Sequence, residues 1–208
     1  MKRWLTVLTC LLAITLQAQV GSSISEKTKS MKKMDGFFPF WYDAANGKIW
    51  LLANKINSEF LYVNSLPAGL GSNDIGLDRG QLGDTRIVYF HKVGKKLLLI
   101  QPNYNYRASS ADIQEQKAVA ESFASSTLAS FTIEAEENGN YLIDMTSFLL
   151  RDAHGVADKI RSMRQGSYVF NEARSAVYIN NTKNFPLNSE FEAIISFVGG
   201  SDAGRLVR

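Results

Sequence analysis

The chain has 208 residues, of which 45% are hydrophobic and 21% are charged, and its formal net charge at pH 7 is +3. This hydrophobic share is typical of a globular protein and excludes an intrinsically disordered chain. Lys2 and Arg3 supply two of the positive charges, so the rest of the chain is nearly neutral. A near-neutral chain gives no reason to expect a nucleic-acid partner. The length is sufficient for one domain, or for one and a half.

The first residues have the order of a secretory signal peptide. Lys2 and Arg3 precede an apolar run over residues 4–16, and Ala18 offers a small residue at a cleavage point. We therefore expect residues 1–18 to be a signal peptide. The protein would then be exported to the periplasm, the cell surface or the medium. A buried N-terminal helix is the alternative, although such a helix should alternate with polar positions.

Cys10 is the only cysteine and lies inside this apolar run. Cleavage of the signal would remove it and leave a mature chain without disulfides or thiol chemistry. A lipid anchor on Cys10 is the alternative, but Thr9 stands where such anchors need a small residue. After residue 18 no stretch reaches the length of a transmembrane helix.

Composition divides the remainder into three regions. Residues 19–35 are polar and rich in lysine, and we expect a flexible leader there. The stretch 67–83 contains five glycines, which disfavour any regular element, so we place a boundary at its end. The regions on either side are a small β module over residues 36–82 and a second β-rich module over 83–208, truncated at its C-terminus.

Several pairs of apolar runs flank short turns. Asn46-Gly47 and Asn138-Gly139 each separate two β-forming runs, which predicts two β-hairpins. A third hairpin is predicted around Gly94. The remaining strands are predicted from β-forming residues at 60–63, 141–150, 168–170, 176–179 and 191–198.

Two segments have helical spacing. Asp112 follows a pair of serines and precedes a segment in which Ile113, Ala120 and Phe123 share one face. Residues 152–163 repeat apolar side chains at helical intervals. The predicted fold class is therefore α+β, a mostly antiparallel sheet built from hairpins with two short helices inserted.

Motifs for catalysis are not found in the sequence. The two histidines, His91 and His154, are far apart, and neither belongs to an H-E-x-x-H motif. Both are interpreted as structural residues, on a strand and near a helix start. Gly69 and Gly71 begin like a dinucleotide-binding loop, but Asp74 occupies the place of the third glycine. We therefore predict no catalytic residue, no cofactor and no metal site of zinc type in this chain.

The glycine-rich loop suggests one weak metal site. Asn73, Asp74 and Asp78 supply oxygen atoms that Ca²⁺ prefers. Their spacing differs from that of an EF-hand loop, and Asn and Asp commonly stabilise turns. Turn formation is the favoured interpretation, and calcium binding is the alternative.

An aromatic cluster suggests a binding surface. Trp41, Tyr42 and Trp50 lie among further phenylalanines and could stack on a sugar or a peptide. The same rings could form the core of a small sheet, which is the more common role of such residues.

Four segments carry a resemblance to a known family. They are 34–41 (MDGFFPFW), 60–81 (FLYVNSLPAGLGSNDIGLDRGQ), 148–155 (FLLRDAHG) and 182–186 (TKNFP). Together they resemble the N-terminal region of a family of exported bacterial zinc-dependent metalloproteases. In that family two modules of unassigned function precede a metzincin-like catalytic domain, which carries the extended H-E-x-x-H motif.

The resemblance implies a non-catalytic portion of such a protease, acting as a scaffold or a substrate-positioning region. Zinc would belong only to the catalytic domain, which would be the main partner, with peptides as further partners. No catalytic or zinc residue is carried over, because no position matches the zinc motif. A free-standing glycan- or peptide-binding module is the alternative, and an intact enzyme of unknown chemistry is disfavoured.

Overall fold

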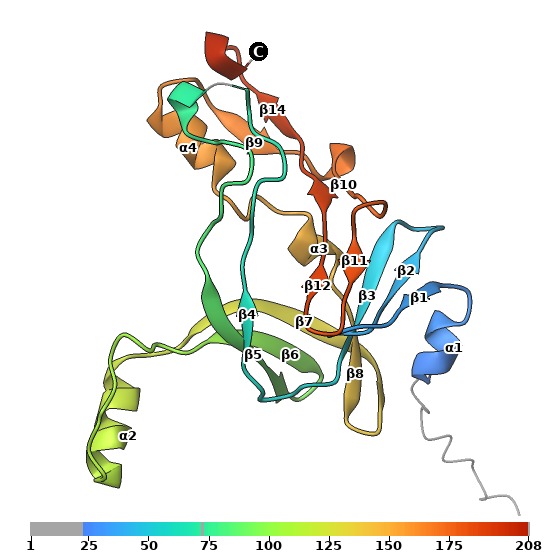
Figure 1. The fold of residues 1–208 in the computed structure, drawn as a ribbon, viewed down its shortest axis with the longest axis vertical. Helices are drawn as coiled ribbons and strands as arrows, with labels where there is room; N and C mark the ends of the chain where they lie inside the picture. The colour runs from blue at the N-terminus through green and yellow to red at the C-terminus, as the bar shows by residue number, and fades with distance from the viewer. Residues whose placement is uncertain (1–22, 72, 208) are drawn as a thin grey trace, which may run out of the picture.

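The computed structural model describes residues 23–71 and 73–207. Its main element is an eight-stranded antiparallel sheet that curls into an open half-barrel (Figure 1). The order across the sheet is β1-β2-β3-β8-β7-β6-β5-β4. The predicted α+β fold with a mostly antiparallel sheet is confirmed. The strands are β1 (Lys32–Met34), β2 (Phe40–Asp43), β3 (Lys48–Ala53), β4 (Phe60–Tyr62), β5 (Arg86–Val93), β6 (Lys96–Gln101), β7 (Ser126–Glu137) and β8 (Asn140–Asp144).

Tight turns close the three predicted hairpins. Gly47, Gly94 and Gly139 have φ values of 65°, 57° and 77°, and Asn138 has a φ of 51°. Glycine adopts such angles without steric cost and asparagine tolerates them, which is why these residues mark the turns. The strand pairs β2–β3, β5–β6 and β7–β8 follow from these turns.

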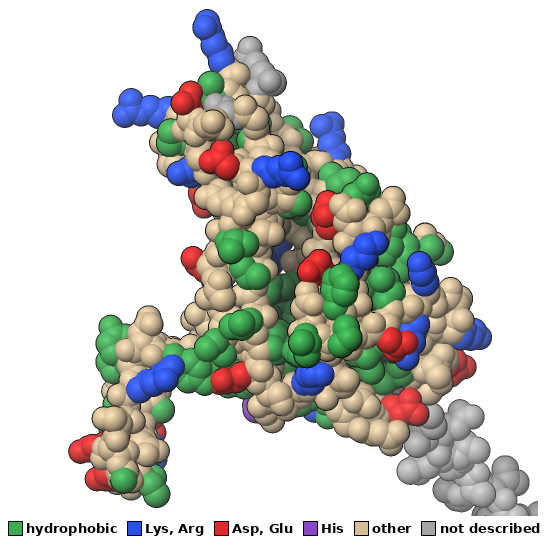
Figure 2. Space-filling view, viewed as in Figure 1, with side chains coloured by type: hydrophobic (Ala, Val, Ile, Leu, Met, Phe, Trp, Pro, Cys, Tyr) green, Lys and Arg blue, Asp and Glu red, His purple; other side chains and the backbone are tan. Residues whose placement is uncertain are grey.

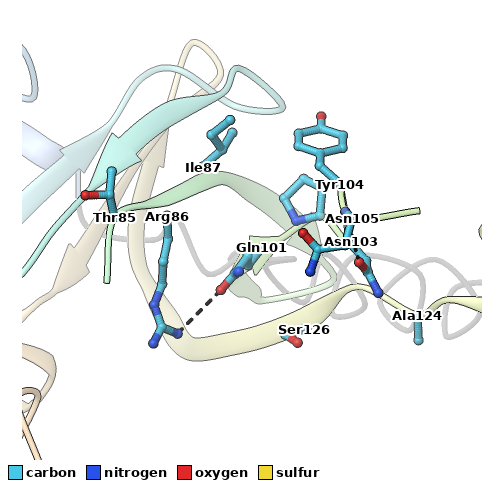
Figure 3. Close-up of a pocket in the computed structure, with 10 residues that line it drawn as sticks. Thr85, Arg86, Ile87, Gln101, Asn103, Tyr104, Asn105, Ala124 and Ser126 are labelled. Carbon is cyan, nitrogen blue, oxygen red and sulfur yellow. Dashed lines mark hydrogen bonds between the residues drawn. The ribbon is translucent and has the colours of Figure 1, made fainter. Parts of the chain in front are cut away.

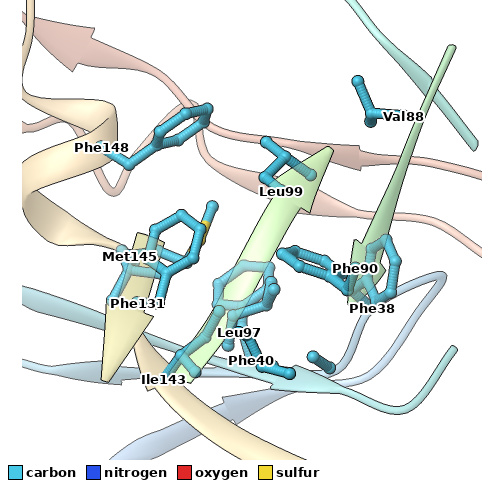
Figure 4. Close-up of a cluster of buried hydrophobic side chains, with 13 residues drawn as sticks. Phe38, Phe40, Val88, Phe90, Leu97, Leu99, Phe131, Ile143, Met145 and Phe148 are labelled. Atoms are coloured by element: carbon cyan, nitrogen blue, oxygen red, sulfur yellow. The ribbon is translucent and has the colours of Figure 1, made fainter. Parts of the chain in front are cut away.

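The concave side of the sheet holds the main hydrophobic core (Figure 4). Strand β3 shows the underlying alternation, because Ile49, Leu51 and Ala53 are buried while the residues between them are half-buried. Phe90 of β5 is 2% exposed, and its ring meets Phe38 edge-to-face with centroids 5.7 Å apart. Edge-to-face pairs of this kind add to the free energy of burial.

Four short helices accompany the sheet in the part of the chain that the structure describes, where the sequence predicted two. They are α1 (Ile24–Thr28), α2 (Ile113–Ser122), α3 (Thr146–Leu149) and α4 (Val156–Ser162). Helices α2 and α4 are the predicted ones. Helix α3 replaces the end of the strand predicted over 141–150, because Asp144 accepts a hydrogen bond from the Thr146 N–H and turns the chain.

The leader expected over residues 19–35 contains regular structure. Helix α1 begins at Ser23, whose side chain accepts a hydrogen bond from the Glu26 N–H. Strand β1 then pairs with β2 and forms one edge of the sheet. The predicted signal peptide at 1–18, with Cys10, lies outside the described residues.

After α4 the chain forms three short strand pairs. The pairs are β9 (Tyr168–Phe170) with β14 (Phe197–Gly199), β10 (Ala176–Val177) with β13 (Ala193–Ile194), and β11 (Lys183–Asn184) with β12 (Ser189–Glu190). Phe191 then packs on the buried Phe40, with ring centroids 4.8 Å apart. This part of the chain therefore closes over the main core.

Asn184 joins the β11–β12 hairpin to the N-terminal segment. Its side-chain amide donates to the carbonyl oxygens of Met34, at 2.8 Å, and Phe38, at 2.9 Å. A Cβ atom on Gly36 would lie 2.2 Å from the Asn184 side-chain oxygen, so only glycine allows this approach.

A second, smaller hydrophobic cluster lies away from the sheet. Ile75 and Leu77 of the glycine-rich loop are buried there against Val156 and Ile160 of α4. The loop therefore crosses from β4 to α4 and returns to β5 (Figure 1). Because β4 pairs with β5, the division expected at residue 82 runs through one continuous sheet.

None of the helices in the described part of the chain is both long and apolar enough to cross a membrane.

Candidate functional site

The structure does not bring the aromatic candidates together on one surface. Trp41 and Trp50 are cross-strand partners, and Trp41 is only 9% exposed because it packs with Ile24 of α1. Tyr42 is on the opposite face of β2, against the main core. These three rings lie on two faces of the sheet rather than forming a single stacking platform.

The candidate calcium ligands lie around a short turn of the loop. Asn73 and Asp74 belong to a single 3₁₀ turn, in which the Asn73 carbonyl accepts from the Gly76 N–H at 3.0 Å. Asn73, Asp74 and Asp78 are all exposed, whereas Ile75 and Leu77 between them are buried. Within residues 23–71 and 73–207, no group of three or more His, Cys, Asp or Glu side chains could hold a metal ion.

The histidines occupy separate places. His154 Nδ1 accepts from the Asn64 side-chain amide at 3.0 Å, near the start of α4. His91 lies exposed on β5, where its Nδ1 bonds the Asn57 side-chain oxygen at 2.9 Å. Because that oxygen only accepts, Nδ1 carries the proton in this bond.

The feature best suited to binding is a pair of adjoining hollows at the root of a projecting segment. This segment, residues 102–125 between β6 and β7, is here called the arm (Figure 1). One hollow has a volume of about 350 Å³ and the other about 510 Å³. Pro102 and Tyr104 line both hollows. The charged side chains of the two hollows lie on opposite faces of the sheet, because Arg86 shares the face of the buried Val88 whereas Tyr89 and His91 alternate to the other face.

The first hollow lies where β5 begins and β6 ends. Arg86 and Gln101 line it from the sheet, and Asn103 and Asn105 face it from the arm (Figure 3). Arg86 donates to the Gln101 side-chain oxygen at 3.4 Å and forms an ion pair with Asp84 at 2.9 Å. Arg86 is the only charged residue among the described residues that line this hollow, and the Gln and Asn amides beside it can both donate and accept hydrogen bonds.

The second hollow has the opposite charge. Glu59, Tyr89 and His91 line it together with the two shared residues. The carboxylate of Glu59 accepts a hydrogen bond from the Tyr104 hydroxyl and forms no ion pair with any residue in the described ranges. This bond raises the pKa of the Tyr104 phenol above its usual value, so Tyr104 remains a donor at neutral pH.

Asn57 supports this hollow through its backbone. Its φ of 56° is unusual for a residue other than glycine, and its N–H donates to the Phe90 carbonyl at 2.8 Å. With this backbone conformation, the Asn57 side-chain oxygen accepts the hydrogen bond from His91.

The arm itself is almost entirely exposed. No residue of α2 is buried, and Ile113 is 74% exposed. Figure 2 shows hydrophobic side chains along the arm and at its root. The apolar face predicted for this helix therefore has no partner within the described residues. The rings of Tyr106 and Phe123 stack 3.8 Å apart and hold the two sides of the arm together.

This arrangement suits binding rather than covalent chemistry. One hollow offers hydrogen-bond donors and the other an acceptor carboxylate, and the rings of Pro102 and Tyr104 line both. No sequence motif marked Glu59, Arg86, Gln101 and Tyr104, because only the pairing of β4, β5 and β6 brings them together.

Comparison with known proteins gives one match. Residues 80–206 match the family described as "Domain of unknown function (DUF5117)". No curated protein and no solved structure is similar enough to the chain to match it. Since the match covers more than half of the sequence, the chain belongs to the DUF5117 family.

Proposed function

We propose that this chain is a non-catalytic portion of an exported zinc-dependent metalloprotease, in which it acts as a scaffold or substrate-positioning region. The resemblance of segments 34–41, 60–81, 148–155 and 182–186 to that family motivates the proposal. The arm is the observation that carries it. Its helix α2 buries no side chain, although Ile113 and Phe123 are apolar.

Exposed apolar side chains on a projecting element are typical of a surface that contacts another protein. The proposed partner is the family's own catalytic domain, with the zinc-binding H-E-x-x-H motif, and peptides are the proposed substrates. The proposed location is outside the cytoplasm, after removal of residues 1–18. No zinc-dependent step is assigned to the residues of this chain.

Mass spectrometry of the native protein tests the proposal. Peptide mapping should find this sequence in the same polypeptide as an H-E-x-x-H motif, or in a stable complex with such a polypeptide. The same map should show a mature N-terminus close to residue 19. A native product that has neither the motif nor a partner carrying it would contradict the proposal.

A peptidase assay provides the complementary measurement. The purified chain should not hydrolyse casein with or without added zinc, whereas the native assembly should do so in a chelator-sensitive manner. Chelator-sensitive hydrolysis by the purified chain alone would show that the catalytic machinery resides within it.

A further inference from the structure

We propose that Arg151 and Tyr62 bind the carboxylate of a peptide that lies along the edge strand β4. This assignment deepens the proposed function, and rests on it only for the origin of the peptide. Three features of the described residues support it. They are an arginine without a carboxylate partner, a tyrosine O–H beside that arginine, and a strand edge that is open on one side.

Arg151 follows helix α3 and is half-buried, with its guanidinium fixed from two directions. The guanidinium carbon lies 4.0 Å from the Phe148 ring centroid, and one N–H donates to the Tyr62 hydroxyl oxygen at 2.8 Å. This arginine forms no ion pair with any residue in 23–71 or 73–207. Because a guanidinium has five N–H donors and stacks on aromatic rings, Arg151 is oriented in advance and keeps most of its donors for a ligand.

Asp152, the acid next to Arg151 in sequence, is directed elsewhere. Its two carboxylate oxygens accept from the N–H groups of Val156 and Ala157, at 2.7 Å and 2.9 Å. The carboxylate therefore caps the start of α4. A half-buried guanidinium without a carboxylate is costly, and a ligand that supplies one relieves this cost.

Tyr62 places a second donor beside the guanidinium. Its hydroxyl oxygen accepts from Arg151, while its own O–H donates to none of the described residues. The Tyr62 ring is held against Phe148, with ring centroids 5.7 Å apart. A carboxylate can accept one bond from this O–H and further bonds from the guanidinium, and such charge-assisted bonds are the stronger ones.

Arg86 adds a second positive charge on the same face of the sheet. It is the cross-strand partner of Tyr62, and both side chains lie on the face of the buried Val88. Arg86 pairs with Asp84 at 2.9 Å, so the two arginines share one carboxylate among the described residues. One positive charge is left over. A single carboxylate balances it, whereas a phosphate group carries nearly two negative charges and would exceed it.

The position of Tyr62 favours a peptide as the source of the carboxylate. Strand β4 is the last strand of the sheet and pairs only with β5 among the described strands. Its other edge offers backbone N–H and carbonyl groups, which an extended peptide can pair with and a sugar chain cannot match in register. Figure 2 shows the surface hollowed between the β4 side and the C-terminal strand pairs, and the chain from α3 to α4 crosses this region in Figure 1.

Calorimetric titration of the purified chain with two matched pairs of peptides tests the proposal. N-acetyl-Ala-Ala-Phe with a free C-terminal carboxylate is compared with its amide, and the amide of N-acetyl-Ala-Glu-Phe with its Gln counterpart. The acid should bind about tenfold more tightly than its neutral relative in at least one pair, and that pair identifies a terminal or a side-chain carboxylate. The difference should shrink as salt is added.

Variants of the two residues separate their contributions. Arg151→Gln should bring acid and neutral probes to within about twofold of each other, and Tyr62→Phe, which keeps the ring, should reduce the preference about threefold. Arg107→Gln and Tyr106→Phe carry matched changes on the exposed arm and should leave the preference unchanged. Thermal unfolding of every variant checks that the fold is intact.

Chemical labelling of the unaltered chain provides a readout that does not depend on a folded Arg151 variant. The acid probe should slow the modification of Arg151 by phenylglyoxal, measured by peptide mapping, and should not slow that of Arg107. Equal rates with and without the probe would contradict the proposal.

Equal affinity for the acid and neutral members of both pairs would overturn the proposal, as would an unchanged preference in Arg151→Gln. Tighter binding of inorganic phosphate or of an oligogalacturonate than of any peptide acid, lost in Arg151→Gln, would instead assign the site to another anion. These measurements need no catalytic domain. A failure here therefore leaves the protease proposal standing, and failure of the mass-spectrometric test leaves the carboxylate site standing.

Discussion

Phe131 in β7 and Phe123 in the arm are close in sequence, yet Phe131 is 5% exposed and Phe123 is 38% exposed. The first belongs to a core of thirteen buried residues enclosed by the curled sheet, and the second to a segment whose helix buries none. Both segments are rich in apolar residues, so composition does not distinguish them. The difference indicates that the sheet provides the free energy of folding, while the arm and its root are available for contacts with other molecules.

The largest expected effect comes from removing the strands that precede the family match. A chain that begins at Gly80 lacks β1 to β4 and should not fold. It loses five of the thirteen core residues, and β8 loses its partner β3. Far-ultraviolet circular dichroism and hydrogen exchange would measure the loss of folded structure. A cooperative unfolding transition in the shortened chain would show that the matched region is independent of the strands before it. The core residues lost are Phe38, Phe40, Ile49, Leu51 and Ala53.

A single core substitution should have the next largest effect. Phe40→Ala should lower the free energy of unfolding by about 3–5 kcal/mol, because Phe40 is 0% exposed and its removal leaves a cavity beside Phe191. Ile113→Ala on the arm is the matched control and should change the free energy of unfolding by less than ~0.5 kcal/mol. Urea denaturation would measure both. Similar losses from the two variants would remove the distinction between sheet and arm.

The ion pair between Lys48 and Asp144 should have a smaller, pH-dependent effect. Burial raises the pKa of Asp144, but hydrogen bonds from Lys48 and Thr146 outweigh it and hold the pKa below its usual value. The carboxylate therefore stabilises the fold above the unfolded-state pKa of about 4, and this contribution is lost as the pH falls through the lower folded-state pKa.

We expect Asp144→Asn to cost about 1 kcal/mol at pH 7, a modest value because Lys48 is partly exposed. The variant should also lose less stability than the original chain between pH 6 and pH 3. Urea denaturation across this range would measure the two slopes. Parallel pH profiles would mean that Asp144 does not contribute to acid unfolding.

The smallest expected effect comes from shortening the arm. Replacing residues 106–123 by two glycines should change the free energy of unfolding by less than ~0.5 kcal/mol, since α2 contacts no core. The stacked rings of Tyr106 and Phe123 show that the two ends lie close enough to join. Thermal denaturation would measure this. A loss above ~2 kcal/mol would show that the arm packs on the body in solution.

The sequence predicted those parts of the fold that depend on local chemistry. The Asn46-Gly47 and Asn138-Gly139 turns specify their hairpins through backbone angles that few residues adopt. It did not predict that α2 would be exposed, because helical spacing of apolar residues does not reveal whether another element packs against them. Nor did it predict helix α3, since apolar residues such as Phe148 and Leu149 continue the apolar run beyond Asp144.

Local sequence patterns did not predict the candidate site. Glu59, Arg86 and Tyr104 lie in three separate segments, and only the order of β4, β5 and β6 brings those segments together. The aromatic residues at 41, 42 and 50 were a clearer signal in the sequence, but the alternation of a strand sends them to opposite faces. The glycine-rich loop contained a usable signal in Ile75 and Leu77, which are too apolar for a surface turn.

The hydrogen bonds of Asn184 have a consequence for the newly made chain. Strands β1 to β3 emerge first from the ribosome. Strand β3 cannot pair with β8, and the carbonyls of Met34 and Phe38 cannot bond Asn184, until those later residues have been made. Phe191, which packs on Phe40, arrives later still. The β1–β2–β3 unit can pair within itself early, but its β3 edge lacks a partner until most of the protein has been translated, and a ribosome-associated or translocation-associated chaperone would find that edge open for the whole interval.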